Sequence, residues 1–428
     1  MMNIPNTLNN LMRILIRNGI DCYVAGGAVR DHIMGRVPND FDVVAVGTDA
    51  QSIQNLVGGN LISQSSGKMI VEVHVDGQVY QFSVVDSLSE DARSRDFTMN
   101  AMFYDIVENR VIDLVGGIGH IDNGVIHHVS NRFVNDPLRI LRAARFVSVF
   151  GFSVHAETLR YFRSINRQFV SDFNNPNNGS RVYAEYSRIL VGRFVRNAFL
   201  MLQDANALPR EISDLVGCQQ SPVYHPEGDV FNHTLHTLQY AATRMMGRED
   251  ALVICLTMLL HDIGKPATVD ANLHAFGHED VGAEMAADFM SRYGFPNEIA
   301  NRVLPLIRCH MRRDLNTPSA VRRLSVDVAP ESLDNLAIVM ECDSSGRPPL
   351  PSGMPLDVSN MLQIARDLNV SSNQPQPILQ GRHLISVFQM SPSPRFGEVL
   401  SAAFRAQIDG QFDTLEGALS FVVDAGLV

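Results

Sequence analysis

The stretch YVAGGAVRDHIMGRVPNDFDVVAVG, residues 23–47, places the carboxylates of Asp40 and Asp42 one residue apart, downstream of the glycine pair Gly26 and Gly27. Alternating apolar and acidic residues are typical of a half-exposed strand, so the two carboxylates could simply face water. On an extended segment, residues i and i+2 also project from the same face, which suits two oxygen ligands of a Mg²⁺ site. The surrounding residues decide between these interpretations.

A strand, a glycine turn and a short helix are expected before the acidic pair. Residues 22–27 (CYVAGG) predict the strand with its turn, and residues 27–35 (GAVRDHIMG) predict the helix. Glycines let a backbone approach a phosphate, and the first amides of the following helix point at the anion. Arg30 adds a planar donor one turn into this helix, with Asp31 to support it. This order of features favours phosphate and metal binding over a solvated strand.

Composition indicates a globular chain of two or more domains, since 45% of its 428 residues are hydrophobic. The net charge of −11 argues against a surface coated with basic groups for non-specific binding of nucleic acid. Residues 132–210 nevertheless carry many arginines and no lysine. That region could hold phosphates, or it could be a set of solvated helix faces.

Cysteine usage and hydropathy predict a cytoplasmic protein without a membrane span. The five cysteines are odd in number, widely separated and mostly inside apolar runs, which favours buried reduced thiols. The longest apolar run, residues 251–260, is about half of what a bilayer span needs. The first nineteen residues lack the apolar core of a secretory signal and predict an amphipathic helix that ends at Gly19.

The hydrophobic period changes near Phe133. Before it, residues 20–125 alternate strand-like and helical patterns, which predicts an α/β domain. After it, apolar residues recur every three or four positions, so the rest of the chain is expected to be helical. Proline and glycine gather at 218–229 and 344–357, where domain boundaries are expected. The expected strands are 22–27, 42–47, 69–85 and 110–117.

Three more motifs follow GGAVRD…NDFD in order along the chain. They are SRDFTMNAM at 94–102, NDPLRILRAARF at 135–146 and SRVYAEYSRIL at 180–190. Together the four motifs resemble those of polymerase-beta-type nucleotidyltransferases, specifically the CCA-adding tRNA nucleotidyltransferases and their poly(A) polymerase relatives. Three positions depart from the family pattern: Ser94 stands where an Arg is usual, and Asn135 and Ser180 each replace a Glu.

The resemblance implies a role for each matched residue of the first two motifs. Asp40 and Asp42 would carry two Mg²⁺ ions that activate an RNA 3′-hydroxyl and stabilise the leaving pyrophosphate of a nucleoside triphosphate. Gly27, Arg30 and Arg95 would position the triphosphate.

Asp136 and Arg139 invite two interpretations. Three residues apart on a helix, they would share a face and form an ordinary ion pair. They could also read a base, because cytosine and adenine both present an exocyclic amine beside a ring-nitrogen acceptor, which a carboxylate and a guanidinium match. The resemblance assigns them this templating role and places Arg142 one turn further, toward the phosphates. Asp96 is either a further metal-facing acid or a helix N-cap.

The second half of the chain carries a candidate metal site. An adjacent His-Asp pair, with a histidine before it and an acid far behind it, is a ligand set for a borderline divalent ion. The pattern resembles the HD phosphohydrolase superfamily, with His233, His261, Asp262 and Asp343 in the four ligand positions. That resemblance implies phosphatase and cyclic-phosphodiesterase activities on RNA ends. Three more residues are expected either to line a phosphate pocket or to be exposed: Lys265, His278 and His310.

The predicted fold is an α/β nucleotidyltransferase head followed by all-α neck, HD and tail domains. The predicted reaction is the template-independent addition of C, C and A to tRNA 3′ ends from CTP and ATP. Mg²⁺ is the expected cofactor of the head, and a divalent transition metal that of the HD site. The predicted domains are the head at 1–130, a neck for nucleotide selection and RNA binding at 131–218, the HD domain at 219–346 and a tRNA-contacting tail at 347–428.

Three other functions remain open from the sequence. A poly(A) polymerase shares the head chemistry, although the HD domain favours CCA addition. A hydrolase with a vestigial head would not need both Asp40 and Asp42. An RNA-binding protein that uses only the arginine-rich helices would need neither acid cluster.

Overall fold

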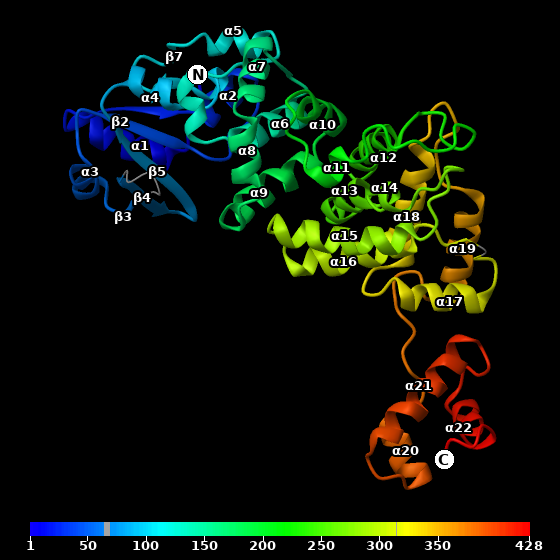
Figure 1. Ribbon diagram of the computed structural model, residues 1–428. Coiled ribbons are helices and arrows are strands. Elements are labelled where there is room, and N and C mark those ends of the chain that lie inside the picture. Colours follow the sequence, from blue (N-terminus) through cyan, green and yellow to red (C-terminus); the bar gives the residue numbers. More distant parts are fainter. Residues whose placement is uncertain (64–68, 314) are drawn as a thin grey trace. The chain divides into compact units, whose positions relative to one another are not determined.

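The computed structural model describes residues 1–63, 69–313 and 315–428. The chain divides into two compact units. The first comprises Met1–Phe173 with Leu200–Ala207, and the second comprises Asn174–Phe199 with Leu208–Val428. Figure 1 shows the strands and the first helices in the blue to cyan part of the chain, and helices in the rest.

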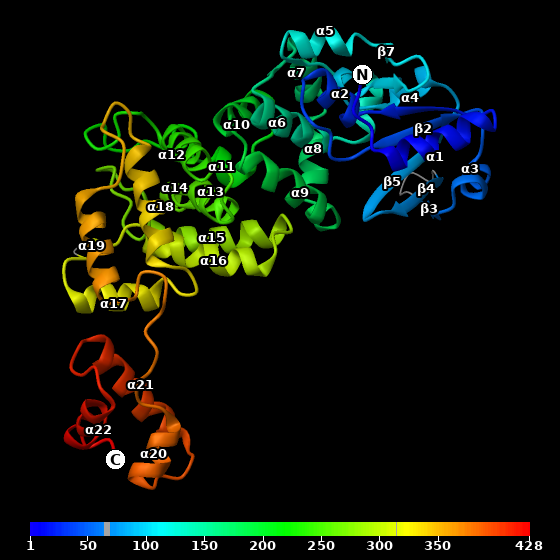
Figure 2. The same cartoon turned by 180° about the vertical axis from the view of Figure 1, so that it is seen from behind.

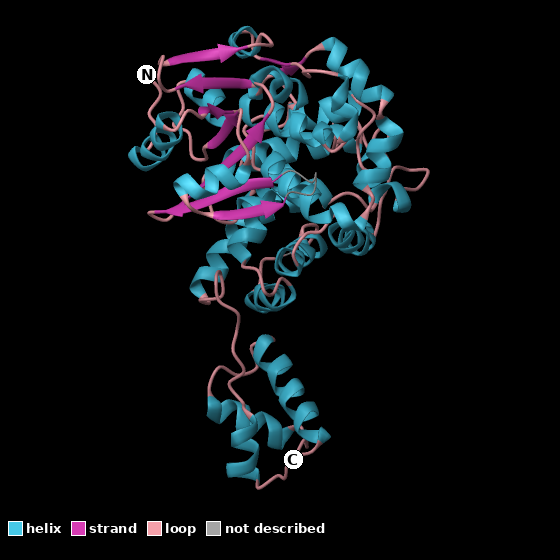
Figure 3. Ribbon diagram, turned by 90° about the vertical axis from the view of Figure 1, so that its left-hand side faces the viewer, coloured by secondary structure: helices cyan, strands magenta, loops and turns pink. Residues whose placement is uncertain are grey.

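A seven-stranded mixed sheet forms the centre of the first unit, in the order β3-β4-β5-β2-β1-β6-β7 (Figure 3). Strands β2 and β5 are parallel, and the other neighbouring pairs are antiparallel. The α/β head expected from the sequence is therefore present. The strands are β1 (Asp21–Ala25), β2 (Asp42–Val46), β3 (Asn60–Ser63), β4 (Met69–Val75), β5 (Gln78–Val85), β6 (Met102–Asp105) and β7 (Arg110–Asp113).

A hairpin turn divides the segment that the sequence predicted as one strand over 69–85. Asp76 and Gly77 both have positive φ, at 52° and 74°. Two successive residues of this kind make the tight turn whose twist matches antiparallel strands. The pattern of alternating residues continued through the turn, so it did not reveal the break. Strands β3 and β6 were also not predicted.

Helices cover this sheet and continue beyond it within the first unit. The amphipathic helix expected to end at Gly19 is α1, which buries Leu8, Met12 and Leu15. The helices of the unit are α1 (Asn6–Arg17), α2 (Gly27–Ile33), α3 (Ala50–Val57), α4 (Leu88–Ser94), η1 (Thr98–Asn100), α5 (Gly117–Asp122), η2 (Asn131–Asn135), α6 (Arg139–Phe150), α7 (Ala156–Ser164) and α8 (Asn166–Phe173).

One short strand pair interrupts the region that was expected to be purely helical. Strands β8 (Val125–Ile126) and β9 (Ser153–Val154) pair in parallel on either side of α6. They are only two residues long, which is too short for a period-2 pattern to register in the sequence.

The second unit is helical throughout its described residues. Its centre is α13, whose side chains from Val253 to Leu260 are buried. Helices α12, α16 and α18 pack against it, and Figure 2 shows α12 and α18 beside it from behind. The helices are η3 (Pro176–Asn178), α9 (Gly179–Leu190), α11 (Arg210–Ser213), α12 (Val230–Arg244), α13 (Ala251–Leu260), α14 (Lys265–Thr268), α15 (His278–Arg292), α16 (Asn297–Cys309), α17 (Pro318–Asp327), α18 (Leu333–Ser345), α19 (Leu356–Asp367), α20 (Gly381–Phe388), α21 (Pro394–Ile408) and α22 (Leu415–Asp424). The residues of α10 (Val195–Asp204) are divided between the two units.

One segment, Ala251–Thr268, has the length and apolar composition of a membrane span. It contains α13, and two thirds of it is buried inside the protein. Its hydrophobicity is therefore explained by its place at the centre of a helical core.

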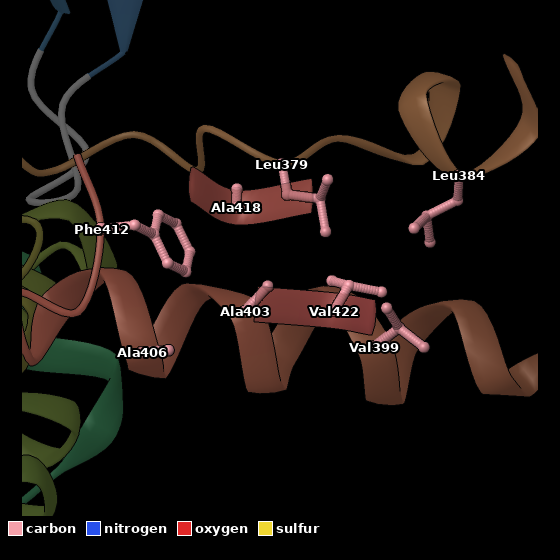
Figure 4. Close-up of a cluster of buried hydrophobic side chains, with 8 residues drawn as sticks. All are labelled: Leu379, Leu384, Val399, Ala403, Ala406, Phe412, Ala418 and Val422. Carbon is pink, nitrogen blue, oxygen red and sulfur yellow. The ribbon is translucent and has the colours of Figure 1, made fainter. Parts of the chain in front are cut away.

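The last helices have a small core of their own. Leu384 of α20, Val399 and Ala403 of α21, and Val422 of α22 are buried against one another (Figure 4). The preceding helix, α19, packs instead on α17 and α18. The expected helical tail is present, but its first helix belongs to a different core from its last three.

Candidate active sites

The first site lies where β1 ends and β2 begins. Asp42 is the first residue of β2, and its register partner on β1 is Ala25, the last residue before the glycine pair. Asp40 and Asp42 are exposed, whereas Phe41 between them is buried. This alternation of exposure is compatible with two carboxylates on one side of the chain.

The pKa of Asp42 is raised by partial desolvation, and by the negative charges of Asp40 and Asp91, while the positive charge of Arg95 acts in the opposite direction. Carboxylates that crowd one another in this way favour a bound cation, because the cation removes their repulsion. The donor set of exposed carboxylate oxygens therefore fits Mg²⁺.

The glycine turn brings Arg95 against the backbone at this site. Gly26 has a φ of 74°, and a Cβ placed there would lie 2.7 Å from Nη1 of Arg95. Gly27, which the sequence singled out, would meet only Arg30, at an ordinary contact distance of 3.5 Å. Gly26 is thus the position at which a side chain is excluded, and the sequence could not distinguish the two glycines.

Arg95 is held by three contacts. Its Nε donates to Asp91 Oδ2 at 2.7 Å and its Nη1 donates to the carbonyl oxygen of Asn100 at 3.2 Å. Its guanidinium also lies over the ring of Phe103. Because it is fixed in this way and acts on the charge of Asp42, Arg95 presents a preorganised positive charge beside the acidic pair.

Arg30 is more enclosed than a phosphate-binding role alone would require. It donates from Nε and Nη2 to Asp31 Oδ1, as the sequence suggested, and from Nη1 to Asn100 Oδ1 at 2.8 Å. Its guanidinium stacks over Phe146 and Phe150 of α6. Arg30 therefore links α2 to α6.

The sequence reasoning missed Asn100, which joins these groups. This buried side chain accepts from Arg30 and donates from Nδ2 to Asp96 Oδ1 at 3.0 Å, while its carbonyl accepts from Arg95. The available signal was its place in the motif SRDFTMNAM, five residues after Arg95.

Asp96 faces the interior and not the acidic pair. It accepts from the backbone N–H of Phe97 at 2.7 Å and from Arg142 Nε at 2.6 Å. Burial alone would raise the pKa of Asp96, but Arg142 and the hydrogen bonds hold it below its usual value. Neither of the two roles considered describes it: η1 is capped by Phe97 without a side-chain hydrogen bond, and the Asp96 carboxylate instead pairs with Arg142. Arg142, expected to face the phosphates, is engaged by this buried carboxylate.

Asp136 and Arg139 are arranged differently from the helical pair that their spacing suggested. Asp136 precedes α6 in an extended conformation, and Arg139 is the first residue of that helix. The reason is Pro137, since a residue before proline is disfavoured in the helical region. The backbone N–H of Arg139 donates to the carbonyl of Asp136 at 3.0 Å, which keeps the two residues adjacent.

One side of the Arg139 guanidinium is anchored and the other is not. Nη2 donates to the carbonyl of Ser94 at 3.1 Å, and the group lies over the ring of Phe133. Nη1 is buried and has no hydrogen-bond partner among the described residues. An unsatisfied buried donor is costly, so its presence indicates a site for an acceptor on a ligand.

The second site lies at the centre of the helical unit, and the structure brings all four predicted ligands together there. His233 Nε2 on α12 is 3.0 Å from Asp343 Oδ1 on α18. It is 3.8 Å from Asp262 Oδ2, which in turn is 3.2 Å from His261 Nε2. These side chains are buried or nearly so.

Three histidines share one orientation in this site. His261, His278 and His310 each direct Nδ1 to the backbone carbonyl three residues earlier, at 2.9, 2.7 and 2.6 Å. A carbonyl only accepts, so each Nδ1 carries the proton and each neutral imidazole keeps a lone pair on Nε2. This tautomer leaves Nε2 of each ring available to bind a metal.

His278 and His310 are buried and face Asp262, so of the two alternatives that the sequence left open, surface exposure does not apply to them. Their Nε2 atoms lie 3.2 and 4.0 Å from Asp262 Oδ1. Their own Nε2 atoms are 3.4 Å apart. Burial lowers the pKa of His310 to about 3, so this ring stays neutral. Lys265, the third expected pocket residue, lies 2.7 Å from Asp262 Oδ2.

The donor set fits one or two divalent transition metals. His233, His261 and Asp262 form one cluster of potential ligands, and Asp262, His278 and His310 form another, so Asp262 is common to both. Nε2 of His261 is buried without a hydrogen-bond partner among the described residues. Imidazole with carboxylate suits metals of the zinc, nickel or iron type.

Glu227 is a second residue that the sequence reasoning missed. Its buried carboxylate contacts Nδ1 of His233 at 2.7 Å and Nδ1 of His225 at 2.9 Å. A carboxylate behind a ligating histidine orients the ring and strengthens it as a ligand. The side chain lies six residues before His233, in the run HPEGDVFNH.

Comparison with known proteins assigns both parts of the chain to a class. The model of the poly A polymerase head domain matches residues 22–86 and 70–127, and that of the HD domain matches residues 230–345. The chain is similar in fold along 99% of its length to the Bacillus stearothermophilus CCA-adding enzyme in complex with CTP, with a TM-score of 0.68 and 20% identity, covering 98% of that chain. The Thermotoga maritima CCA-adding enzyme complexed with tRNA gives a TM-score of 0.62 at 19% identity, over 99% of this chain and 96% of that one. The fold and sites thus define a nucleotidyltransferase head joined to an HD domain.

Closer relatives name the family. The chain is 31% identical to the multifunctional CCA protein of Nitrosospira multiformis over 76% of its length and 83% of that protein's. It is 33% identical to that of Aromatoleum aromaticum, over 76% of this chain and 85% of the other. The chain belongs to the multifunctional CCA protein family.

Proposed function

We propose that this enzyme adds C, C and A to tRNA 3′ ends from CTP and ATP without a nucleic-acid template, with Asp40 and Asp42 as its catalytic carboxylates. The observation that carries the proposal is the exposed acidic pair at the start of β2, with the fixed guanidinium of Arg95 acting on Asp42. Asp40 and Asp42 would hold Mg²⁺. The metal, when bound, lowers the pKa of the attacking 3′-hydroxyl and neutralises charge on the triphosphate.

The protein's own contribution is to position the triphosphate. The turn at Gly26 allows the backbone to approach a phosphate closely, and α2 starts directly after it, so its first N–H groups can donate to the anion. Gly27, Arg30 and Arg95 act here, Arg95 as the nearest fixed charge and Arg30 mainly through Asn100. Arg142 contributes indirectly, through its hydrogen bond with Asp96.

Base selection is assigned to Asp136 and Arg139. Nη1 of Arg139 is a buried donor without a partner among the described residues, and the ring-nitrogen acceptor of cytosine or adenine supplies what it lacks. The Asp136 carboxylate, adjacent to it in the chain, accepts from the exocyclic amine. Guanine and uracil present the opposite order of donor and acceptor and are rejected.

The first experiment incubates the purified protein with Mg²⁺, CTP, ATP and a tRNA that lacks its last three nucleotides, and then sequences the RNA 3′ ends. Ends that read C-C-A support the proposal. Tails of A alone would instead identify a poly(A) polymerase. Unchanged or shortened ends would contradict nucleotide addition and leave hydrolysis as the remaining candidate activity.

The HD site supports a second activity, metal-dependent hydrolysis of phosphate esters, including cyclic phosphates at RNA ends. Three imidazoles that offer Nε2 lone pairs around one buried aspartate favour it. His233, His261, Asp262 and Asp343 would hold a metal, with His278 and His310 available for a second. A metal supplies an activated water when bound. Lys265, close to Asp262 and partly exposed, is placed to attract the phosphate.

The division of labour along the chain follows from these assignments. The head at 1–130 transfers the nucleotide, the neck at 131–218 selects it and contacts RNA, the HD domain at 219–346 hydrolyses, and the tail at 347–428 contacts tRNA. We place the enzyme in the cytoplasm. Its five cysteines are free, and burial raises the pKa of four of them to about 11 or above, which suits a reducing compartment.

A further inference from the structure

A cluster of histidines lies in the first unit, apart from both sites described above. It is brought together by the short parallel pair of β8 and β9. Ile126 and Val154 are register partners, so His127 and His155, the next residue in each strand direction, emerge side by side. Their ring centroids are 4.4 Å apart. Glu157 follows two residues after His155 in the first turn of α7.

The orientation of His127 is fixed by the backbone. Its Nδ1 donates to the carbonyl oxygen of His128 at 2.7 Å. The neutral ring therefore carries its lone pair on Nε2. That Nε2 lies 3.6 Å from Oε2 of Glu157, beyond hydrogen-bond distance. A lone pair opposite a carboxylate oxygen is repulsive unless a proton or a metal ion lies between them, and at 3.6 Å there is room for the metal ion after a small movement of Glu157.

The remaining contacts hold the cluster together. His120 of α5 stacks on His127 with centroids 5.0 Å apart and planes 15° apart, and its Nδ1 is held by Thr98 Oγ1 at 2.9 Å. His155 caps α7, where its Nδ1 accepts from the backbone N–H of Glu157 at 3.3 Å. Binding a metal through either nitrogen of His155 displaces this long hydrogen bond, because a neutral imidazole has only one lone pair. The stacking occupies the ring faces of His127 and leaves its Nε2 edge toward Glu157.

The spacing of the donor atoms matches a metal site. One ligand atom from each of His127, His155 and Glu157 lies within 4.8 Å of the other two. Ligands about 2.1 Å from a tetrahedral metal are about 3.4 Å from one another. Small side-chain rotations bring the ligand atoms from separations of up to 4.8 Å to this shorter distance. The side chain of Glu157 is 58% exposed and free to move, while that of His127 is 19% exposed and fixed.

We propose that His127, His155 and Glu157 bind a divalent transition metal of the Zn²⁺ class, in a structural site separate from the Mg²⁺ and HD sites. Two imidazoles and one carboxylate are the ligands that such ions prefer, whereas Mg²⁺ prefers oxygen alone. The metal joins the end of β8 to the start of α7. It thereby holds together the two ends of the segment 128–154, which carries Asp136 and Arg139.

The test is a metal count on the full chain. Protein stripped with a chelator is dialysed against micromolar Zn²⁺, and bound zinc is measured by elemental analysis for the wild type and for Glu157→Gln and His155→Gln. The HD site is intact in all of them. We expect each variant to bind one equivalent less than the wild type, or to bind that equivalent at least tenfold more weakly.

A matched control and a second readout make the result decisive. His74 is another exposed histidine next to a glutamate, with Nε2 2.7 Å from Glu72 Oε1, and it belongs to no potential ligand cluster found among the described residues. His74→Gln should bind as much zinc as the wild type. With Co²⁺, the wild type should show visible absorption bands that Glu157→Gln reduces. Equal zinc and equal cobalt spectra in the wild type and a folded Glu157→Gln would overturn the proposal.

Discussion

At Asn100, a single buried amide connects groups that come from three separate sequence motifs. It binds Arg30 from the glycine-turn motif, Asp96 from its own motif and, through Asp96, Arg142 from α6. Arg30 and Arg142 are thereby positioned by hydrogen bonds among protein groups. In the proposed nucleotide site these arginines are therefore oriented by the protein itself, which is what positioning a triphosphate requires.

Replacing Asn100 with alanine should weaken both the fold and the nucleotide site. The change leaves Arg30 and the buried Asp96 each short of a hydrogen bond, which costs about 1–3 kcal/mol. Urea unfolding should show this loss, and the KM for CTP and ATP should rise. The control is Asn123→Ala, whose exposed side chain donates only to the carbonyl of Gly119. Similar stability losses in both variants would argue against the linking role.

Arg139→Lys should relax the choice of base more than it weakens binding of the triphosphate. Lysine keeps the charge but not the planar donor pair. Losing one good bidentate contact costs about 1–3 kcal/mol of discrimination, so incorporation of U and G should rise relative to C and A by about tenfold. Competition among the four nucleotides, read by sequencing of the products, measures the ratio.

Arg132→Lys is the matched control, since that arginine is exposed and pairs with Glu90. If Arg139→Lys raises the KM for all nucleotides equally and leaves the base ratio unchanged, the assignment of templating to this residue is wrong.

At the scale of elements, close approach of two helices places the HD ligands. Gly346 ends α18, and a Cβ there would lie 2.2 Å from Cγ2 and 2.9 Å from the backbone nitrogen of Thr237 on α12. His233 is one turn before Thr237, and Asp343 is one turn before Gly346. The small residue therefore allows the contact between these two ligands.

Gly346→Ala should separate α12 from α18 and weaken metal binding at the HD site. Overpacking of this kind costs about 1–3 kcal/mol of stability. Calorimetric titration of the metal-free protein with Ni²⁺ should show lower affinity. Gly397→Ala in α21 is the control, since a Cβ there meets nothing within 4 Å, and it should be neutral or stabilising by up to about 1 kcal/mol. Unchanged metal affinity in Gly346→Ala would contradict this account.

At the scale of the whole molecule, the two sites lie in separate compact units, the acidic pair in the first and the HD cluster in the second. Each has its own buried core and its own ligands. The two activities should therefore be lost independently.

Asp42→Ala should lower nucleotide addition by a factor on the order of 10³, because a metal ligand supplies several kcal/mol of transition-state stabilisation. It should leave hydrolysis of a phosphate ester unchanged. His261→Gln should do the reverse, and should also release metal from the HD site. Both activities are measured on the same preparations, with circular dichroism to verify folding. Loss of both activities in a folded variant would show that the sites depend on one another.

The sequence determined the chemistry and the order of the domains, because these depend on residue types and on their local spacing. The strand, glycine turn and acid pair lie in one short run, the arginines lie in short motifs, and His261 and Asp262 are adjacent, so residue type and local spacing pointed to them. The sheet and the change to helices followed from hydrophobic period in the same way.

Only the tertiary structure decided which groups face the reaction and which support it. The buried Asp96 proved to pair with the partly exposed Arg142, His278 and His310 were found to face Asp262, and Asn100 and Glu227 to link distant segments. Whether Gly26 or Gly27 must lack a side chain depended on Arg95, about seventy residues away. The physical reason is that burial and hydrogen-bond partners come from residues far apart in the chain, and local periodicity carries no information about them.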